Sequence, residues 1–195
     1  MRLLAPTFVC CLAIAFAGCG KKPESAKREQ WTVTVGAQTR EQLTERLSKT
    51  NLSEQNEPES FRLLVRFSPD FKTSPTKADL DLVVVTAEDL KLPIAKWAPL
   101  IPFDEFKAKL TEAGYALCPH DAVAALMLTM QGFEPLEFTY VATEPIMGMR
   151  EQRPAMRLLV PVVFTYLGVP YIVMRPLDLT TESPHRYIVV RPRKG

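Results

Sequence analysis

The apolar stretch Leu158–Met174 constrains the fold of this 195-residue chain more than any other feature. It approaches the length of a membrane-spanning helix, but two prolines and a glycine interrupt it. Its two tyrosines also suit a buried strand pair better than a span through lipid. We therefore expect a buried β-hairpin, with a tight turn at Gly168 between strands at 157–166 and 169–175.

Hydrophobic periodicity extends this expectation to the rest of the chain. Period-two alternation predicts strands at 31–35 and 79–85, and residues typical of strands predict others at 61–67, 136–142 and 185–191. Helical spacing predicts helices at 39–49, 104–113 and 122–131. Thr39 and Asp121 stand at the positions of N-terminal capping residues. Because strands and helices do not alternate regularly, we expect an α+β fold, a mainly antiparallel sheet with two or three short helices on one face.

The N-terminal end of the chain has the layout of a signal peptide. Met1 and Arg2 give a short positive start, and an apolar segment runs from Leu3 to Ala17. This segment is too short to cross a hydrocarbon core of about 30 Å as a helix, which needs about 20 residues. It has the dimensions of the apolar region of a secretory signal.

The segment ends in Phe16-Ala17-Gly18-Cys19, which resembles the lipobox of bacterial lipoproteins: a hydrophobic residue, two small residues and a cysteine. In that family the signal peptidase cuts before the cysteine, which carries a diacylglyceryl thioether and usually an N-linked acyl chain such as palmitate. The resemblance implies that residues 1–18 are removed and that Cys19 is lipidated. Phe16 departs from the family, which most often has Leu there. An ordinary secretory signal cut nearby is the alternative.

The polar stretch 19–30 that follows has the composition of a flexible tether. Gly20 follows the cysteine, where enterobacterial lipoproteins retained at the inner membrane have Asp. The resemblance therefore implies a cell-membrane or outer-membrane location, on the periplasmic or extracellular face. We divide the chain into a signal peptide at 1–18, a lipidated tether at 19–30 and a single α+β domain at 31–195.

Charge and cysteine content exclude several classes of protein. The chain has 24 basic and 22 acidic side chains, and loss of Arg2 brings the two counts closer still. Such a nearly neutral chain shows no sign of the basic face that phosphate binding requires, so we expect no nucleic-acid partner. Cys10 and Cys11 leave with the signal and Cys19 is lipidated. Cys118 is then the remaining thiol, and an intrachain disulfide is excluded.

Cys118 is the strongest candidate for catalysis. It lies near a predicted helix start, which lowers the pKa of a thiol, and His120 or His185 could act as its base. Adjacent residues of an extended segment point in different directions, so a buried packing cysteine is the favoured interpretation. An envelope enzyme that uses Cys118 stays the alternative. Two distant histidines and one free thiol lack the spacing of a zinc site, and we expect neither a metal nor another cofactor.

A protein-binding surface is the other functional feature. The proline-rich segment 87–102, which contains Trp97, predicts apolar coil, and Phe103 follows it. Met147 and Met149 lie in a further loop, and methionine-rich loops suit adaptable contacts. Core filling is the simpler interpretation of these side chains. We predict a lipid-anchored, non-catalytic lipoprotein of the cell envelope, an accessory, scaffold or binding module with the membrane and an envelope protein as its partners.

Basic residues gather at the C-terminus, at Arg186, Arg191, Arg193 and Lys194. Such a cluster suits contact with anionic lipid headgroups or an acidic envelope polymer. A solvated, frayed chain end is the simpler interpretation.

Overall fold

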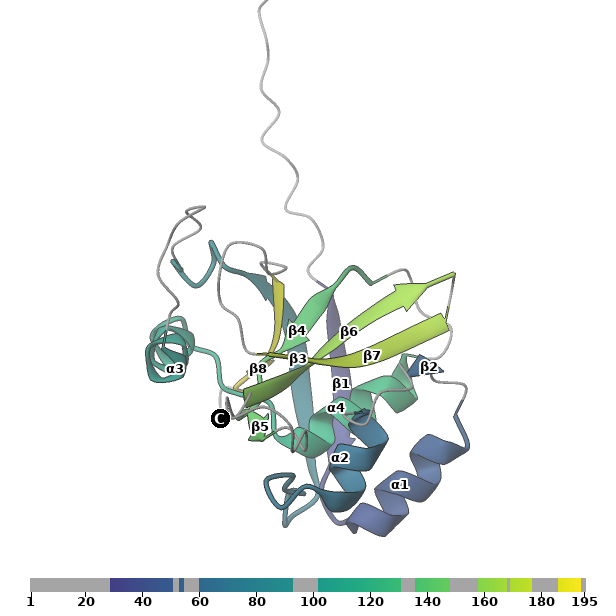
Figure 1. Cartoon of the computed structure of the whole chain (residues 1–195). Coiled ribbons are helices and arrows are strands. Elements are labelled where there is room, and N and C mark those ends of the chain that lie inside the picture. Colours follow the sequence, from purple (N-terminus) through teal and green to yellow (C-terminus); the bar gives the residue numbers. More distant parts are fainter. Residues whose placement is uncertain are drawn as a thin grey trace, which may run out of the picture.

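The computed structural model describes residues 29–50, 53–54, 60–92, 102–130, 136–147, 158–167, 169–176 and 186–193. Within these ranges, eight strands form one sheet and four helices pack on it (Figure 1). The strands are β1 (Gln30–Val35), β2 (Ser53–Glu54), β3 (Ala78–Thr86), β4 (Thr139–Val141), β5 (Ile146–Met147), β6 (Leu158–Tyr166), β7 (Val169–Pro176) and β8 (Arg186–Arg191). The helices are α1 (Arg40–Ser48), α2 (Phe61–Phe67), α3 (Phe103–Glu112) and α4 (His120–Thr129). The α+β fold class is thus confirmed.

The sheet is mostly antiparallel, and its strand order is β1-β3-β8-β4-β6-β7-β2, with β5 paired to β6 outside this path. Only the β4–β8 and β2–β7 pairs are parallel among the described strands. β1 therefore lies at one edge of the sheet. The predicted hairpin is present as β6–β7, which pairs from Tyr166↔Val169 to Leu159↔Pro176. Its turn residue Gly168 lies outside the described residues.

Helices cover both faces of the sheet, and the expectation of helices on one face is wrong. α1, α2 and α4 pack on one apolar cluster, whereas α3 adds Phe106 to a second cluster on the opposite face. β3 contributes to both, because Leu82 and Val84 face the first cluster and Val83 and Val85 face the second. A strand buried on both faces has a continuous apolar run instead of an alternating pattern. None of the described helices is long and apolar enough to cross a membrane.

One segment predicted as a strand, 61–67, is the helix α2. Its apolar residues alternate, but the buried ones are Phe61, Leu64 and Val65, which have the i, i+3, i+4 spacing of one helix face. Ser60 starts the helix, because its hydroxyl accepts a hydrogen bond from the Leu63 N–H at 3.4 Å. Burial of this helix face in the first apolar cluster therefore decides its conformation.

Helix α4 begins at His120, earlier than predicted, and Asp121 is not its capping residue. Pro119 occupies the capping position. The Asp121 side chain is 3% exposed, and its Oδ2 accepts hydrogen bonds from the N–H groups of Gly36 at 3.0 Å and Ser74 at 2.9 Å. Its Oδ1 accepts a third from the Ser74 hydroxyl at 2.9 Å. The carboxylate thus joins the end of β1 and the loop before β3 to α4.

Candidate binding surfaces

The structure places Cys118 in the core of the domain. Its side chain is 2% exposed, and its Sγ lies 3.5 Å from the carbonyl oxygen of Ile188. Burial raises the pKa of this thiol far above its ordinary value, because the thiolate would lose its hydration. A protonated, enclosed thiol is a poor nucleophile. The interpretation of Cys118 as a buried packing cysteine is confirmed.

Both ring nitrogens of His120 also contact backbone groups of the domain. Its Nδ1 accepts a hydrogen bond from the Lys72 N–H at 3.1 Å, and its Nε2 lies 2.8 Å from the Glu144 carbonyl oxygen. This pairing places the ring proton on Nε2. The ring also stacks on Phe71, with 5.5 Å between centroids. His120 therefore holds the start of α4 against two loops, and the other suggested base, His185, lies outside the described residues.

Two members of the C-terminal basic cluster are held in ion pairs. Arg193 donates to both carboxylate oxygens of Asp81, from Nε at 3.0 Å and Nη2 at 2.9 Å. Arg186 bridges Glu29 and Glu137 at 2.7 Å each. These two guanidinium groups thus bind within the domain. Across the described ranges, no group of three or more His, Cys, Asp or Glu side chains is placed to hold a metal ion.

The predicted binding residues lie only partly within the described chain. Trp97 and Met149 are outside it. Phe103, at the start of α3, is partly buried against the second apolar cluster. The centroid of its ring lies 6.3 Å from that of Phe106. Met147 on β5 is 42% exposed. Phe103 therefore contributes to the core, as the simpler interpretation expects, and Met147 faces solvent.

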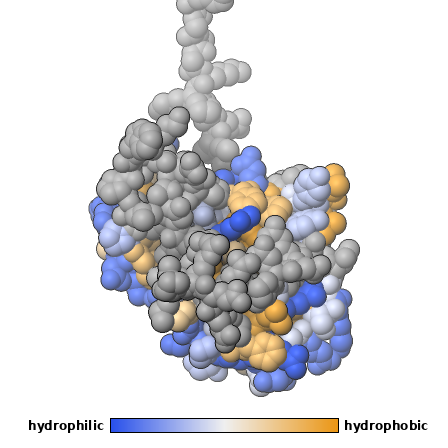
Figure 2. Space-filling model, viewed as in Figure 1, coloured by the Kyte–Doolittle hydropathy of each residue, from blue (hydrophilic) through white to orange (hydrophobic). Residues whose placement is uncertain are grey.

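A row of aromatic rings follows the β6–β7 hairpin and ends at its tip. The ring of Phe164 stacks on those of Phe138 and Tyr171, with 4.6 Å and 5.2 Å between the ring centroids. Tyr166 contacts Tyr171 edge-on, with 6.1 Å between the centroids. We call these four residues and the adjacent Leu167 the aromatic tip. Phe164 and Tyr171 in the middle of the row are partly buried, whereas Phe138 is 38% exposed, Tyr166 59% and Leu167 86%. Hydrophobic surface accordingly appears at the upper right of Figure 2, where the hairpin ends in Figure 1.

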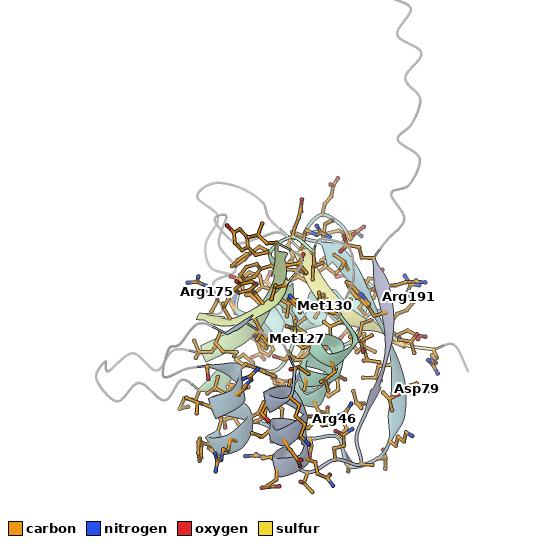
Figure 3. All side chains as sticks on the ribbon, turned by 90° about the vertical axis from the view of Figure 1, so that its right-hand side faces the viewer. Arg46, Asp79, Met127, Met130, Arg175 and Arg191 are labelled. Atoms are coloured by element: carbon orange, nitrogen blue, oxygen red, sulfur yellow. The ribbon has the colours of Figure 1, made fainter. Side chains whose placement is uncertain are left out.

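A groove of about 290 Å³ runs beside β1 at the edge of the sheet. We call it the β1 groove; its lining comes from β1, α1, α4 and the β1–α1 loop, and includes Thr32, Val33, Thr34, Val35, Gly36, Gln38, Leu43, Arg46, Asp121, Ala125, Leu128 and Thr129. In Figure 3, Arg46 lies on the side of α1 that faces β1. Its guanidinium donates to the neutral amide oxygen of Gln38 at 2.8 Å, and it makes no ion pair within the described residues.

The register of β1 directs part of its backbone into this groove. Val84 donates its N–H to the carbonyl oxygen of Glu29 at 3.0 Å, so the odd-numbered residues of β1 form the bonded pairs with β3. Hydrogen-bonded and non-bonded pairs alternate in an antiparallel ladder. The N–H and C=O groups of Thr32 and Thr34 therefore point away from β3, toward the outer edge. Gly36 has the same parity, and its N–H is directed to Asp121.

Sequence reasoning missed both surfaces. Alternation identified β1 as a strand but carries no information about its place at the edge of the sheet. In the sequence Tyr166 and Tyr171 favour a hairpin, and two aromatic residues beside a turn are also a signal for an exposed cluster. Both surfaces suit binding, since one offers backbone hydrogen-bonding groups and the other apolar rings.

Comparison of the chain with protein-family models, with curated proteins and with solved structures finds no match.

Proposed function

We propose that this protein is a lipid-anchored, non-catalytic lipoprotein of the cell envelope that acts as a binding module for a partner protein. The observation that carries the proposal is Phe16-Ala17-Gly18-Cys19 at the end of an apolar segment. Each acyl CH₂ buried in a bilayer contributes about 0.8 kcal/mol, and two signals together give stable anchoring. Anchored through Cys19, the domain faces the periplasm or the outside of the cell.

The β1 groove supports the binding role. An extended segment of a partner can add to a free sheet edge, where main-chain hydrogen bonds give affinity and side-chain pockets give specificity. The outward groups of Thr32 and Thr34 supply the first, and Ala125 and Leu128 of α4, which are partly buried, add apolar surface to the groove. Arg46 adds a positive charge at the side. The occupant that fits is an extended polypeptide segment with an acidic residue.

The alternative, an envelope enzyme with a Cys118 nucleophile, gains no support from this geometry. The thiol is enclosed, burial raises its pKa, and both ring nitrogens of His120 have other contacts. A catalytic role would need the core to open at Ile188 before the thiol could meet a substrate.

The anchor is tested by the mass of the N-terminal peptide of the protein recovered from native membranes. A peptide that begins at Cys19 and carries a diacylglyceryl group is the expected result. An unmodified peptide that begins elsewhere would refute the anchor, and the protein would then be a secreted domain.

The groove is tested by two substitutions at one position. Thr34→Pro removes the outward N–H of β1, which an edge strand tolerates, and Thr34→Val removes only the hydroxyl that donates to Asp79 at 2.6 Å. A partner that co-purifies with the wild-type protein from native membranes should be lost with Thr34→Pro and kept with Thr34→Val. Retention of the partner by both folded variants would rule out strand addition at β1.

A further inference from the structure

We infer that the aromatic tip contacts the membrane, so that the hairpin end with Tyr166 and Leu167 lies among the lipid headgroups of the anchored protein. The inference rests on the proposed anchor at Cys19. It adds the orientation of the domain on the bilayer and the residues that hold this orientation.

The apex residue Leu167 carries two energetic costs, one from its exposed side chain and one from its backbone. Its apolar side chain is 86% exposed, and its φ of 51° lies in the left-handed region. Residues with a Cβ rarely adopt this region, and Asn or Gly would be the ordinary choice for such a turn. Strained backbone of this kind persists where function requires it. An apolar, strained apex therefore points to a surface other than water.

The rings behind the apex make the tip a firm amphipathic unit. The ring of Phe164 stacks between those of Phe138 and Tyr171. Tyr171 contacts Tyr166 edge-on, with 6.1 Å between the ring centroids. Stacked rings support one another beyond the area they bury. A tyrosine joins an apolar ring to a hydroxyl that needs a polar partner, and this combination concentrates tyrosine at membrane–water interfaces. The tip thus has the side-chain chemistry of an interfacial contact.

The tip lies at the end of the domain from which the chain leads back to Cys19. Arg186 binds both Glu29, the first described residue, and Glu137 at 2.7 Å each, and Glu137 precedes Phe138, the first ring of the tip. The start of β1 and the end of the hairpin also both lie in the upper part of the fold in Figure 1. This end of the domain is therefore the one that the anchor holds near lipid.

The length of the connecting segment limits the distance from the bilayer. Ten peptide steps separate Cys19 from Glu29 (29 − 19). At full extension they span at most about 35 Å. Glu29 thus stays within about this distance of the membrane. A projecting hairpin end suits a flat interface, whereas a small ligand would need a concave pocket.

The test uses the full protein extracted from native membranes and reconstituted in vesicles of phosphatidylethanolamine with a minority of phosphatidylglycerol. An environment-sensitive fluorophore is attached to the thiol of Leu167→Cys. It labels this position alone, because Cys118 is buried and the Cys19 thiol is acylated in this preparation. The control is Glu45→Cys on α1, whose side chain is 65% exposed; α1 lies in the lower part of Figure 1, below the hairpin end. We expect a blue-shifted emission and quenching by spin-labelled lipid at position 167, and neither at position 45.

A water-like emission at position 167, with no more lipid quenching than at position 45, would overturn the inference. Shielding of position 167 in native membranes but not in the pure lipid vesicles would also overturn it, because a protein would then cover the tip. The mass of the N-terminal peptide in the same preparation separates the two proposals. With the lipid adduct present and position 167 in water, the anchor stands and only the orientation fails. Without the adduct, the proposed function itself fails.

Discussion

Replacement of Asp121 by alanine should strongly destabilise the domain. The carboxylate is 3% exposed and accepts three hydrogen bonds, two from backbone N–H groups and one from the Ser74 hydroxyl. Asp121→Ala leaves the N–H groups of Gly36 and Ser74 without this acceptor, and each buried, unsatisfied donor costs about 1–3 kcal/mol. We expect the free energy of unfolding to fall by about 3–5 kcal/mol, a large share of the roughly 5–15 kcal/mol of an ordinary domain.

Asp121→Asn is the matched control. The amide oxygen can take the place of Oδ2 and accept from both N–H groups, while the amide NH₂ donates to the Ser74 hydroxyl. Only the charge is lost, and hydrogen bonds to a charged group are worth about 1 kcal/mol more than neutral ones. The asparagine variant should therefore lose about 1–2 kcal/mol.

Urea unfolding followed by far-UV circular dichroism measures both variants. The midpoint should shift with little change in the denaturant slope, because the surface exposed on unfolding stays the same. An alanine variant within about 1 kcal/mol of the wild type would refute the argument that this carboxylate joins β1, the loop before β3 and α4, since one lost hydrogen bond is of that order. Equal losses for alanine and asparagine would show that charge, and not acceptor geometry, is the dominant contribution.

Three further predictions follow from local geometry. Gly36→Ala should cost at least about 2 kcal/mol in the same unfolding assay, because φ is +80° and the new Cβ would lie 1.9 Å from the backbone oxygen of Thr76; an unchanged midpoint would contradict this contact. Cys118 should resist iodoacetamide in the native protein and react after unfolding, as mass spectrometry would show, and fast native alkylation would reopen the enzyme hypothesis. The Arg193 hydrogen bonds, with a smaller contribution from Thr32, hold the pKa of Asp81 below its ordinary value of 3.8. Because the folded pKa is the lower one, the stabilisation is present above 3.8 and is lost as the pH falls through the folded pKa. Arg193→Ala should therefore destabilise the domain at neutral pH but not in strong acid, and a difference that persists in acid would contradict the assignment.

Elements with local signals were predictable from sequence. The predicted capping role of Thr39 is confirmed on α1, where its hydroxyl accepts from the Gln42 N–H and the Gln42 side chain accepts from the Thr39 N–H in a capping box. The β6–β7 hairpin is confirmed as well. Both depend on contacts between residues close in sequence, so their residue types are sufficient to specify them.

The candidate surfaces were not predictable in the same way. An edge strand and a central strand can share one alternating pattern, and β1 is an edge strand because, among the described strands, it pairs with β3 on one side and with none on the other. The aromatic tip required the register that sets Phe164 opposite Tyr171, and the pairing of β4 with β6 that brings Phe138 alongside. The β4–β6 pairing joins residues distant in the chain, so the place of Phe138 beside the hairpin could not be predicted from local pattern.

Local patterns of side chains were enough to predict most of the elements and the α+β class, and they are the basis of the lipobox prediction. Tertiary structure decided that α2 is a helix, that α3 covers the second face of the sheet, and that Asp121 joins three segments instead of capping α4. In each case the deciding energy comes from burial and hydrogen bonds between residues far apart in the chain. Such long-range contacts override local preference whenever the two disagree.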